Sequence, residues 1–85
     1  MLNSGLKRDS IEIHKTNGAV IPNLFASVQT NKVFMDANGH LVEAGDEVIR
    51  RTSVGHVERY KVISPGFRER SQWLPAHYQM KVQQI

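Results

Sequence analysis

Hydrophobic and polar residues alternate along much of this chain with a period of two. In segment 10–15, Ile11 and Ile13 occupy one face of an extended chain, and Glu12 and His14 occupy the other. Such alternation is typical of a half-buried β-strand, and no window shows the spacing of an amphipathic helix. The same pattern predicts further strands over 19–29, 32–36, 47–52, 57–64 and 76–84. Segment 41–46 is expected to be a short extended piece that closes in a Gly-Asp turn.

Proline and glycine separate the predicted strands. Pro22 cannot donate a ladder hydrogen bond, so we expect it to interrupt the second strand or to place it at a sheet edge. Pro65-Gly66 ends the strand that precedes it. The polar segment 67–74 is expected to form a loop or a single helical turn, which Pro75 ends. Turns are predicted at Asn17-Gly18 and at Asn38-Gly39, because Asn-Gly pairs favour hairpins. A tight turn that contains Gly55 is predicted over 53–56.

About six short strands separated by turns predict an all-β domain, either a small antiparallel β-barrel or a sandwich. A chain of 85 residues has room for one small domain, and a barrel is favoured because closure removes exposed sheet edges. We assign residues 10–85 to this domain and residues 1–9 to a flexible, disordered tail. The expected core consists of Ile11, Ile13, Leu24, Phe25, Val28, Val33, Met35, Val48, Tyr60, Val62, Tyr78, Met80 and Val82.

Charge is distributed unevenly along the chain. Residues 1–47 contain four Lys and Arg against six Asp and Glu, a net charge of −2. Residues 48–85 contain seven Lys and Arg against two Glu, a net charge of +5, which together give the overall +3. A basic half on a small domain favours a polyanionic partner. The alternative, that these side chains only solvate the surface, stays open.

The predicted strand phase gathers cations on the outer side of the last strands. Inward Tyr60 and Tyr78 place Arg59 and Lys61, and likewise His77 and Lys81, on the outer side. Cations beside an exposed aromatic ring suit a phosphate backbone and a stacked base. The alternative is that Trp73 and Phe67 cap one end of the barrel. The predicted binding residues are Arg50, Arg51, Arg59, Lys61, Arg68, Arg70, Trp73, His77 and Lys81.

No motif in the sequence indicates catalysis. The chain contains no cysteine, which excludes a disulfide, a thiolate metal site and a cysteine nucleophile. Its four histidines are far apart, without the spacing of a zinc site, and there is no nucleophile elbow or glycine-rich phosphate loop. We therefore expect no catalytic residue, no metal and no cofactor. No apolar run approaches the roughly 20 residues of a membrane span, so a cytoplasmic domain without membrane contact is expected.

Several segments, among them Pro65-Gly66-Phe67 and the ending that starts at Pro75-Ala76-His77, resemble a group of small bacterial and prophage-associated β-barrel proteins to which no activity is assigned. More loosely, the order of a Gly-Asp turn, a strand, an aromatic-bearing strand, a Ser-Pro break and a final strand is similar to barrels that join head to tail in tailed phages. The resemblance implies a context in mobile elements and transfers no residue role. The segments are Ile11–Gly18, Ala26–Gln29, Glu43–Asp46, Glu58–Val62, Pro65-Gly66-Phe67 and the Pro75-Ala76-His77-Tyr78-Gln79 ending that continues to Val82.

Two functions from different classes follow from these observations. The first is a non-enzymatic interaction module that binds nucleic acid or another protein through the basic sheet face and the 67–74 loop. The second is a structural or adaptor subunit of a phage-like or mobile-element assembly of the head–tail joining type, in which the barrel forms a ring. Oligomerisation is expected for the second function and stays open for the first.

Overall fold

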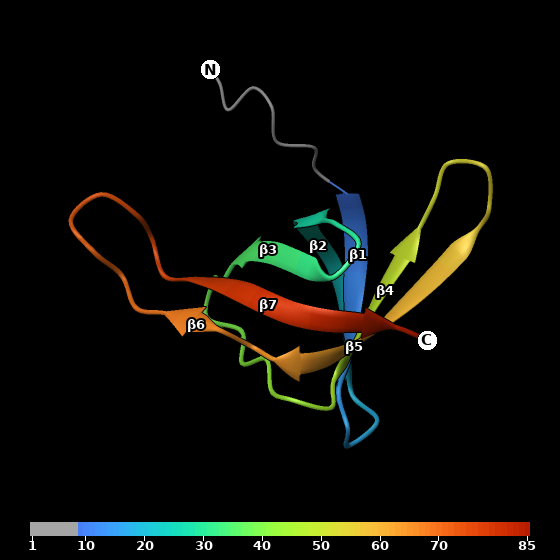
Figure 1. The fold of residues 1–85 in the computed structure, drawn as a ribbon, viewed down its shortest axis with the longest axis horizontal. Coiled ribbons are helices and arrows are strands. Elements are labelled where there is room, and N and C mark those ends of the chain that lie inside the picture. Colours follow the sequence, from blue (N-terminus) through green and yellow to red (C-terminus); the bar gives the residue numbers. More distant parts are fainter. Residues whose placement is uncertain (1–8) are drawn as a thin grey trace.

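The computed structural model describes residues 9–85, which form seven β-strands and no helix (Figure 1). The strands follow the alternating segments closely, because each alternation buries one apolar face. Their bounds are β1 Asp9–His14, β2 Val20–Val28, β3 Lys32–Asp36, β4 Glu47–Arg51, β5 Val57–Ser64, β6 Phe67–Arg68 and β7 His77–Gln84.

The strands form one antiparallel sheet that closes into a barrel. Their order is β3-β2-β1-β4-β5-β7-β6, and an additional pairing of β3 with β7 closes six of them. The short strand β6 lies outside this closure and pairs with β7 through Phe67 and Arg68. The prediction of a small antiparallel β-barrel is therefore confirmed, and the sandwich alternative is wrong.

The barrel interior is filled by the inward residues of every long strand. Eleven of the thirteen predicted core residues are buried, among them Ile13, Val33 and Met80 with no accessible surface. Phe25 was expected in the core, but it is 57% exposed because its neighbours Leu24 and Ala26 take the inward positions of β2. Val28 is partly buried and packs against the core. Sequence reasoning missed four buried hydrophobic residues, which are Ala26, Ala37, Val42 and Ile49.

Four expectations about segments of the chain need correction. Strand β2 continues through Pro22, where a β-bulge absorbs the missing donor and Asn23 adopts a φ of 62°. Segment 67–74 begins with the two-residue strand β6. Segment 41–46 contains no strand, but it closes in the expected turn, where the N–H of Asp46 donates to the carbonyl oxygen of Glu43 at 3.2 Å. Of the predicted tail, residues 1–8 lie outside the described residues, whereas Asp9 belongs to β1 and is only 8% exposed.

Two hairpins extend from the barrel on opposite sides (Figure 1). One joins β4 to β5 through residues 52–56, and the other joins β6 to β7 through residues 69–76. We call the second one, residues 67–77, the arm. The arm follows Gly66, whose φ of 58° and missing side chain let the chain pass against the carbonyl oxygen of Gln79.

Candidate nucleic-acid interface

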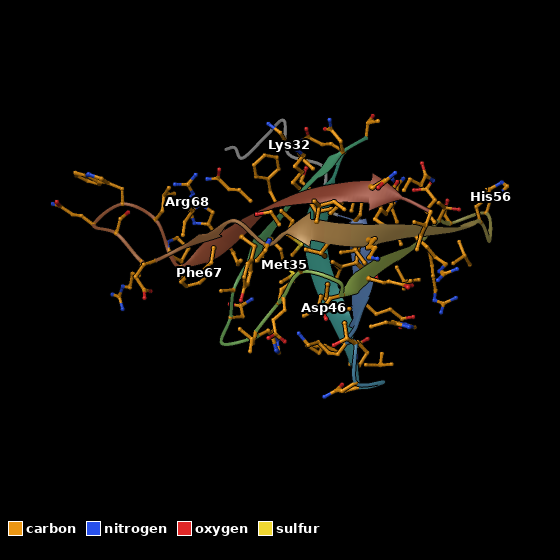
Figure 2. All side chains as sticks on the ribbon, turned by 60° about the horizontal axis from the view of Figure 1, so that its bottom comes forward. Lys32, Met35, Asp46, His56, Phe67 and Arg68 are labelled. Carbon is orange, nitrogen blue, oxygen red and sulfur yellow. The ribbon has the colours of Figure 1, made fainter. Side chains whose placement is uncertain are left out.

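The outer sides of β7, β3 and β6 form a surface that we call the β7 face, comprising Lys32, Phe34, Arg68, His77, Gln79 and Lys81. Inward Tyr78 and Met80 place His77, Gln79 and Lys81 on the outside. Across the sheet, Lys32 is opposite Lys81 and Phe34 is opposite Gln79. On the other edge of β7, Arg68 is opposite His77. Figure 2 shows Lys32 and Arg68 on one side of the sheet, with Phe67 on the other.

Lys32 and Lys81 are directly opposed cations on this face. Both residues are exposed, and no carboxylate of residues 9–85 forms an ion pair with either ammonium group. Like charges opposite each other in a sheet destabilise it by a few tenths of a kcal/mol to about 1 kcal/mol. An anion seated between the two ammonium groups would reverse the sign of this term.

Hydrogen bonds orient the middle of the β7 face. The Nδ1–H of His77 donates to the carbonyl oxygen of Pro75 at 2.9 Å, and the amide of Gln79 donates to His77 Nε2 at 3.1 Å. Asp36 of β3 is the cross-strand neighbour of His77. Among the described residues, it is the one carboxylate that lies directly opposite a residue of β7. The face therefore carries three permanent cations against one carboxylate at its edge.

An open groove of about 290 Å³ runs along the β7 face. Its lining includes the half-buried Phe34 and the exposed residues Lys32, Gln79 and Lys81. Asn31 and Met80 complete the lining. These residues form two neighbouring cross-strand pairs of β3 and β7. Lys32 and Lys81 form the cationic pair, and the aromatic Phe34 and the amide-bearing Gln79 form the other.

The outer side of β4 and β5 is different, because its arginines are paired. Arg51 donates to Glu12 Oε1 at 2.8 Å, and Arg59 donates two hydrogen bonds to Glu47 Oε1 at 2.9 and 3.2 Å. Hydrogen bonds from His14 and Arg51 lower the pKa of Glu12, which keeps this carboxylate charged. The predicted face therefore divides into a paired β4–β5 part and the cation-rich β7 face. Lys61 lies between them, exposed and opposite Gln83.

Arg50 does not belong to the outer side. It shares the inward phase of Val48, and its guanidinium lies 3.6 Å from Asp9 Oδ1 and 3.3 Å from Glu58 Oε1. The hydroxyl of Tyr60 donates to Glu58 at 2.9 Å. Burial and then the Glu58 carboxylate raise the pKa of this phenol. Arg50 is therefore half-buried between two carboxylates and is not part of the outer surface with which it was grouped.

The arm carries Arg70 and Trp73 away from the barrel. Trp73 is 83% exposed, so the alternative in which it caps the barrel is wrong. Phe67 instead packs against Tyr78, with ring centroids 5.3 Å apart, and remains partly exposed. The turn is held by Ser71, whose Oγ accepts from Leu74 N at 3.2 Å and whose own N–H donates to the Leu74 carbonyl at 2.9 Å.

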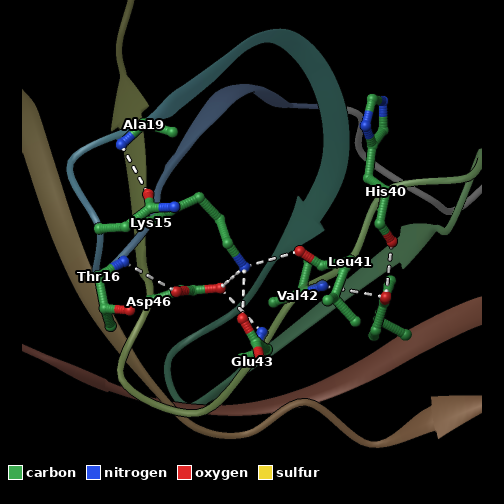
Figure 3. Close-up of polar contacts among 10 residues, drawn as sticks. Lys15, Thr16, Ala19, His40, Leu41, Val42, Glu43 and Asp46 are labelled. Atoms are coloured by element: carbon green, nitrogen blue, oxygen red, sulfur yellow. Dashed lines mark hydrogen bonds and ion pairs between the residues drawn. The ribbon is translucent and has the colours of Figure 1, made fainter.

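At the end of the barrel away from Asp9 and Arg50, a buried ion pair joins Lys15 and Asp46 (Figure 3). Asp46 has no accessible surface, and its carboxylate accepts from the ammonium of Lys15 and from the backbone N–H groups of Thr16 and Glu43. Lys15 also donates to the carbonyl oxygen of Leu41 at 2.7 Å. Burial alone lowers the pKa of Lys15, but its bonds to Asp46 and Glu43 outweigh burial and raise it. This saturated cluster organises the loop and leaves no reactive group available.

The structure brings together only part of the predicted set. Arg68, His77 and Lys81 share the β7 face, Arg70 and Trp73 lie on the arm, and Arg51 and Arg59 are paired elsewhere. Sequence reasoning missed Lys32 and Phe34, although the alternation of segment 32–36 already placed both on its outer side. Pairing of β3 with β7 adds them to the face, and this pairing joins residues more than forty positions apart.

No group of three or more metal-ligating His, Asp or Glu residues occurs within residues 9–85. The same part of the chain contains no helix that is long and apolar enough to cross a membrane. Comparisons of the chain with protein-family models, curated proteins and solved structures find no match. The class that the structure defines is therefore a small closed antiparallel β-barrel domain with an outer strand, and the resemblance to prophage-associated barrels stays an expectation.

Proposed function

We propose that this domain is a non-enzymatic module that binds nucleic acid through the β7 face and the arm. The observation that carries the proposal is the opposed pair Lys32 and Lys81, which has no carboxylate partner among residues 9–85. Arg68 extends the positive surface toward the arm. A row of unpaired cations is the feature that a phosphate backbone requires.

The arrangement of aromatic side chains also supports a nucleic-acid partner. Phe34 lies within the cationic groove, and Trp73 is exposed on the arm formed by the two strands that carry Arg68 and His77. Base stacking on aromatic rings contributes about 1–3 kcal/mol per base, and it tolerates any base sequence. Cationic side chains that contact the phosphate backbone, combined with aromatic rings that stack on bases, favour binding of nucleic acid with little preference for base sequence.

The proposal is tested by removing the unpaired lysines. The Lys32→Gln/Lys81→Gln double variant is expected to bind a fluorescent single-stranded oligonucleotide at least tenfold more weakly in an anisotropy titration. The slope of log affinity against log salt should fall by about 1.4, since each phosphate contact contributes about 0.7 for single strands. The variant should fold at least as stably as the wild type, because an opposed like-charge pair is removed.

The matched control is Arg51→Gln/Arg59→Gln, which removes two charges from the paired outer side of β4 and β5. Both residues are already neutralised by Glu12 and Glu47, so oligonucleotide affinity is expected to stay within about threefold of the wild type. Equal losses in both double variants would show that only net charge matters, and this result would contradict a binding site on the β7 face.

A second function, the ring-forming assembly subunit, is favoured by the two opposite hairpins. Trp73 and Leu74 are exposed on the arm, and Val54 and Val57 are exposed on the β4–β5 hairpin. Two different apolar surfaces on opposite sides permit head-to-tail contacts, which close into rings. Light scattering after gel filtration tests this function: a mass that rises with concentration and falls in Trp73→Ser supports it, and a constant monomer mass contradicts it.

A further inference from the structure

Resting on the proposed function, we infer that the groove beside Phe34 is a binding site for one unpaired nucleobase of a single strand. The neighbouring phosphates lie against Lys32 and Lys81. This inference goes beyond a basic surface, because it assigns a base to a particular ring and distinguishes single strands from duplexes and from base-free polyanions.

The composition of the groove selects a nucleotide over a simple anion. A phosphate group needs only the two ammonium groups of Lys32 and Lys81, which form one row across β3 and β7. The next row contains Phe34 opposite Gln79, and it offers no charge. An aromatic π-face stacks on a base, and a side-chain amide can hydrogen-bond to the edge of a base. Only a ligand that carries both a negative charge and a flat aromatic ring with polar edges can contact both rows at once.

The spacing of the two rows matches this division. Residues two apart in a strand are separated by about 6.6 Å along the strand, so the cation row and the aromatic row are neighbours without overlap. The bond from Gln79 to His77 holds the amide of Gln79 in place at 3.1 Å before a ligand arrives. On the other edge of β7, the N–H of Gln79 donates to the carbonyl oxygen of Gly66 at 3.0 Å, which fixes the backbone of Gln79.

A duplex does not fit the same groove. In double-stranded nucleic acid the faces of the bases are stacked on each other, so the ring of Phe34 would have no face to contact unless a base left the stack. A duplex would therefore use the lysines alone. Single strands are expected to bind at least tenfold more tightly than the corresponding duplex at equal salt.

The experiment uses the full chain and three probes of similar length: a mixed-sequence single-stranded oligonucleotide, its duplex and an inorganic polyphosphate. Phe34→Leu keeps an apolar side chain and removes the π-face. We expect this variant to bind the single strand about tenfold more weakly while its affinity for polyphosphate stays within twofold. The matched control is Phe25→Leu, which changes an exposed phenylalanine of β2 outside the groove, and it should bind all three probes like the wild type.

The outcomes separate the inference from the proposed function. If Phe34→Leu binds all probes normally while Lys32→Gln/Lys81→Gln loses binding, the base site is wrong and the nucleic-acid module stands. If the wild type binds no probe, both fail. If Phe34→Leu does not fold, ultraviolet cross-linking of a thymine oligonucleotide to the wild type decides: adducts in 32–36 or 77–81 support the groove, and adducts confined to Trp73 overturn it.

Discussion

Lys15 and Asp46 form an ion pair across one end of the barrel, joining the residue after β1 to the residue before β4. The carboxylate is fully buried and the lysine side chain is 12% exposed. Two backbone N–H groups share the carboxylate with the ammonium group, so the pair connects the β1–β2 turn to the loop that precedes β4. The end of the loop between β3 and β4 is therefore held against the end of β1.

Removal of the lysine partner should destabilise the domain strongly. Lys15→Met leaves the Asp46 carboxylate buried without its cation, a change that costs about 3–5 kcal/mol in comparable buried pairs. Urea denaturation followed by circular dichroism measures the loss. Lys61→Met is the control, because Lys61 is exposed and forms no ion pair with residues 9–85; it should change stability by less than about 0.5 kcal/mol. Similar effects of the two variants would contradict a structural role for the pair.

Stability should decline in alkaline solution. The folded state raises the pKa of Tyr60 above 10.0, chiefly by burial, and that of Lys15 above 10.5 through Asp46 and Glu43. Both groups therefore hold their protons longer in the folded state, and the free energy of unfolding falls as pH rises from about 10 through the folded pKa values. Thermal melts at about pH 8, about pH 10 and about pH 11 should show the decline as a falling melting temperature. Tyr60→Phe should flatten it, and an unchanged slope would refute the contribution of Tyr60.

Gly66 should tolerate substitution worse than the other turn glycines. An alanine Cβ at this position would overlap the carbonyl oxygen of Gln79, and the φ of 58° is also unfavourable for alanine. The backbone conformation alone costs about 1–2 kcal/mol, and the overlap adds to it by forcing β6 away from β7. Gly55→Ala provides the comparison, since its φ is 92° but no atom lies within 4 Å of the added carbon. Equal losses of stability in the two variants would show that β6 and β7 separate without cost.

Trp73 should contribute little to folding. Because its side chain is 83% exposed, Trp73→Ser is expected to change the free energy of unfolding by less than about 0.5 kcal/mol. A tryptophan that capped the barrel would instead cost about 3–5 kcal/mol on truncation. A melt followed by far-ultraviolet circular dichroism distinguishes the two, and a large drop in melting temperature would mean that the arm folds back onto the barrel.

Local patterning predicted most of the strands, because burial of one face imposes a period of two on each strand independently of its neighbours. Segment 57–64 coincides with β5, and 32–36 coincides with β3. Phe25 shows the limit of this reasoning. A large aromatic residue was assigned to the core by its hydrophobicity, although the phase of Leu24 and Ala26 already placed it outside.

The candidate site was less predictable, because charge counts along the chain do not show which charges meet. Arg51 and Arg59 are cationic in the sequence, but carboxylates from β1 and β4 neutralise them in the barrel. Lys32 belongs to the acidic half of the chain, yet pairing of β3 with β7 places it beside Lys81. Alternation within a strand is a local property that residue order alone dictates. Strand pairing depends on contacts between distant segments, so only the closed barrel decides which outward side chains share a surface.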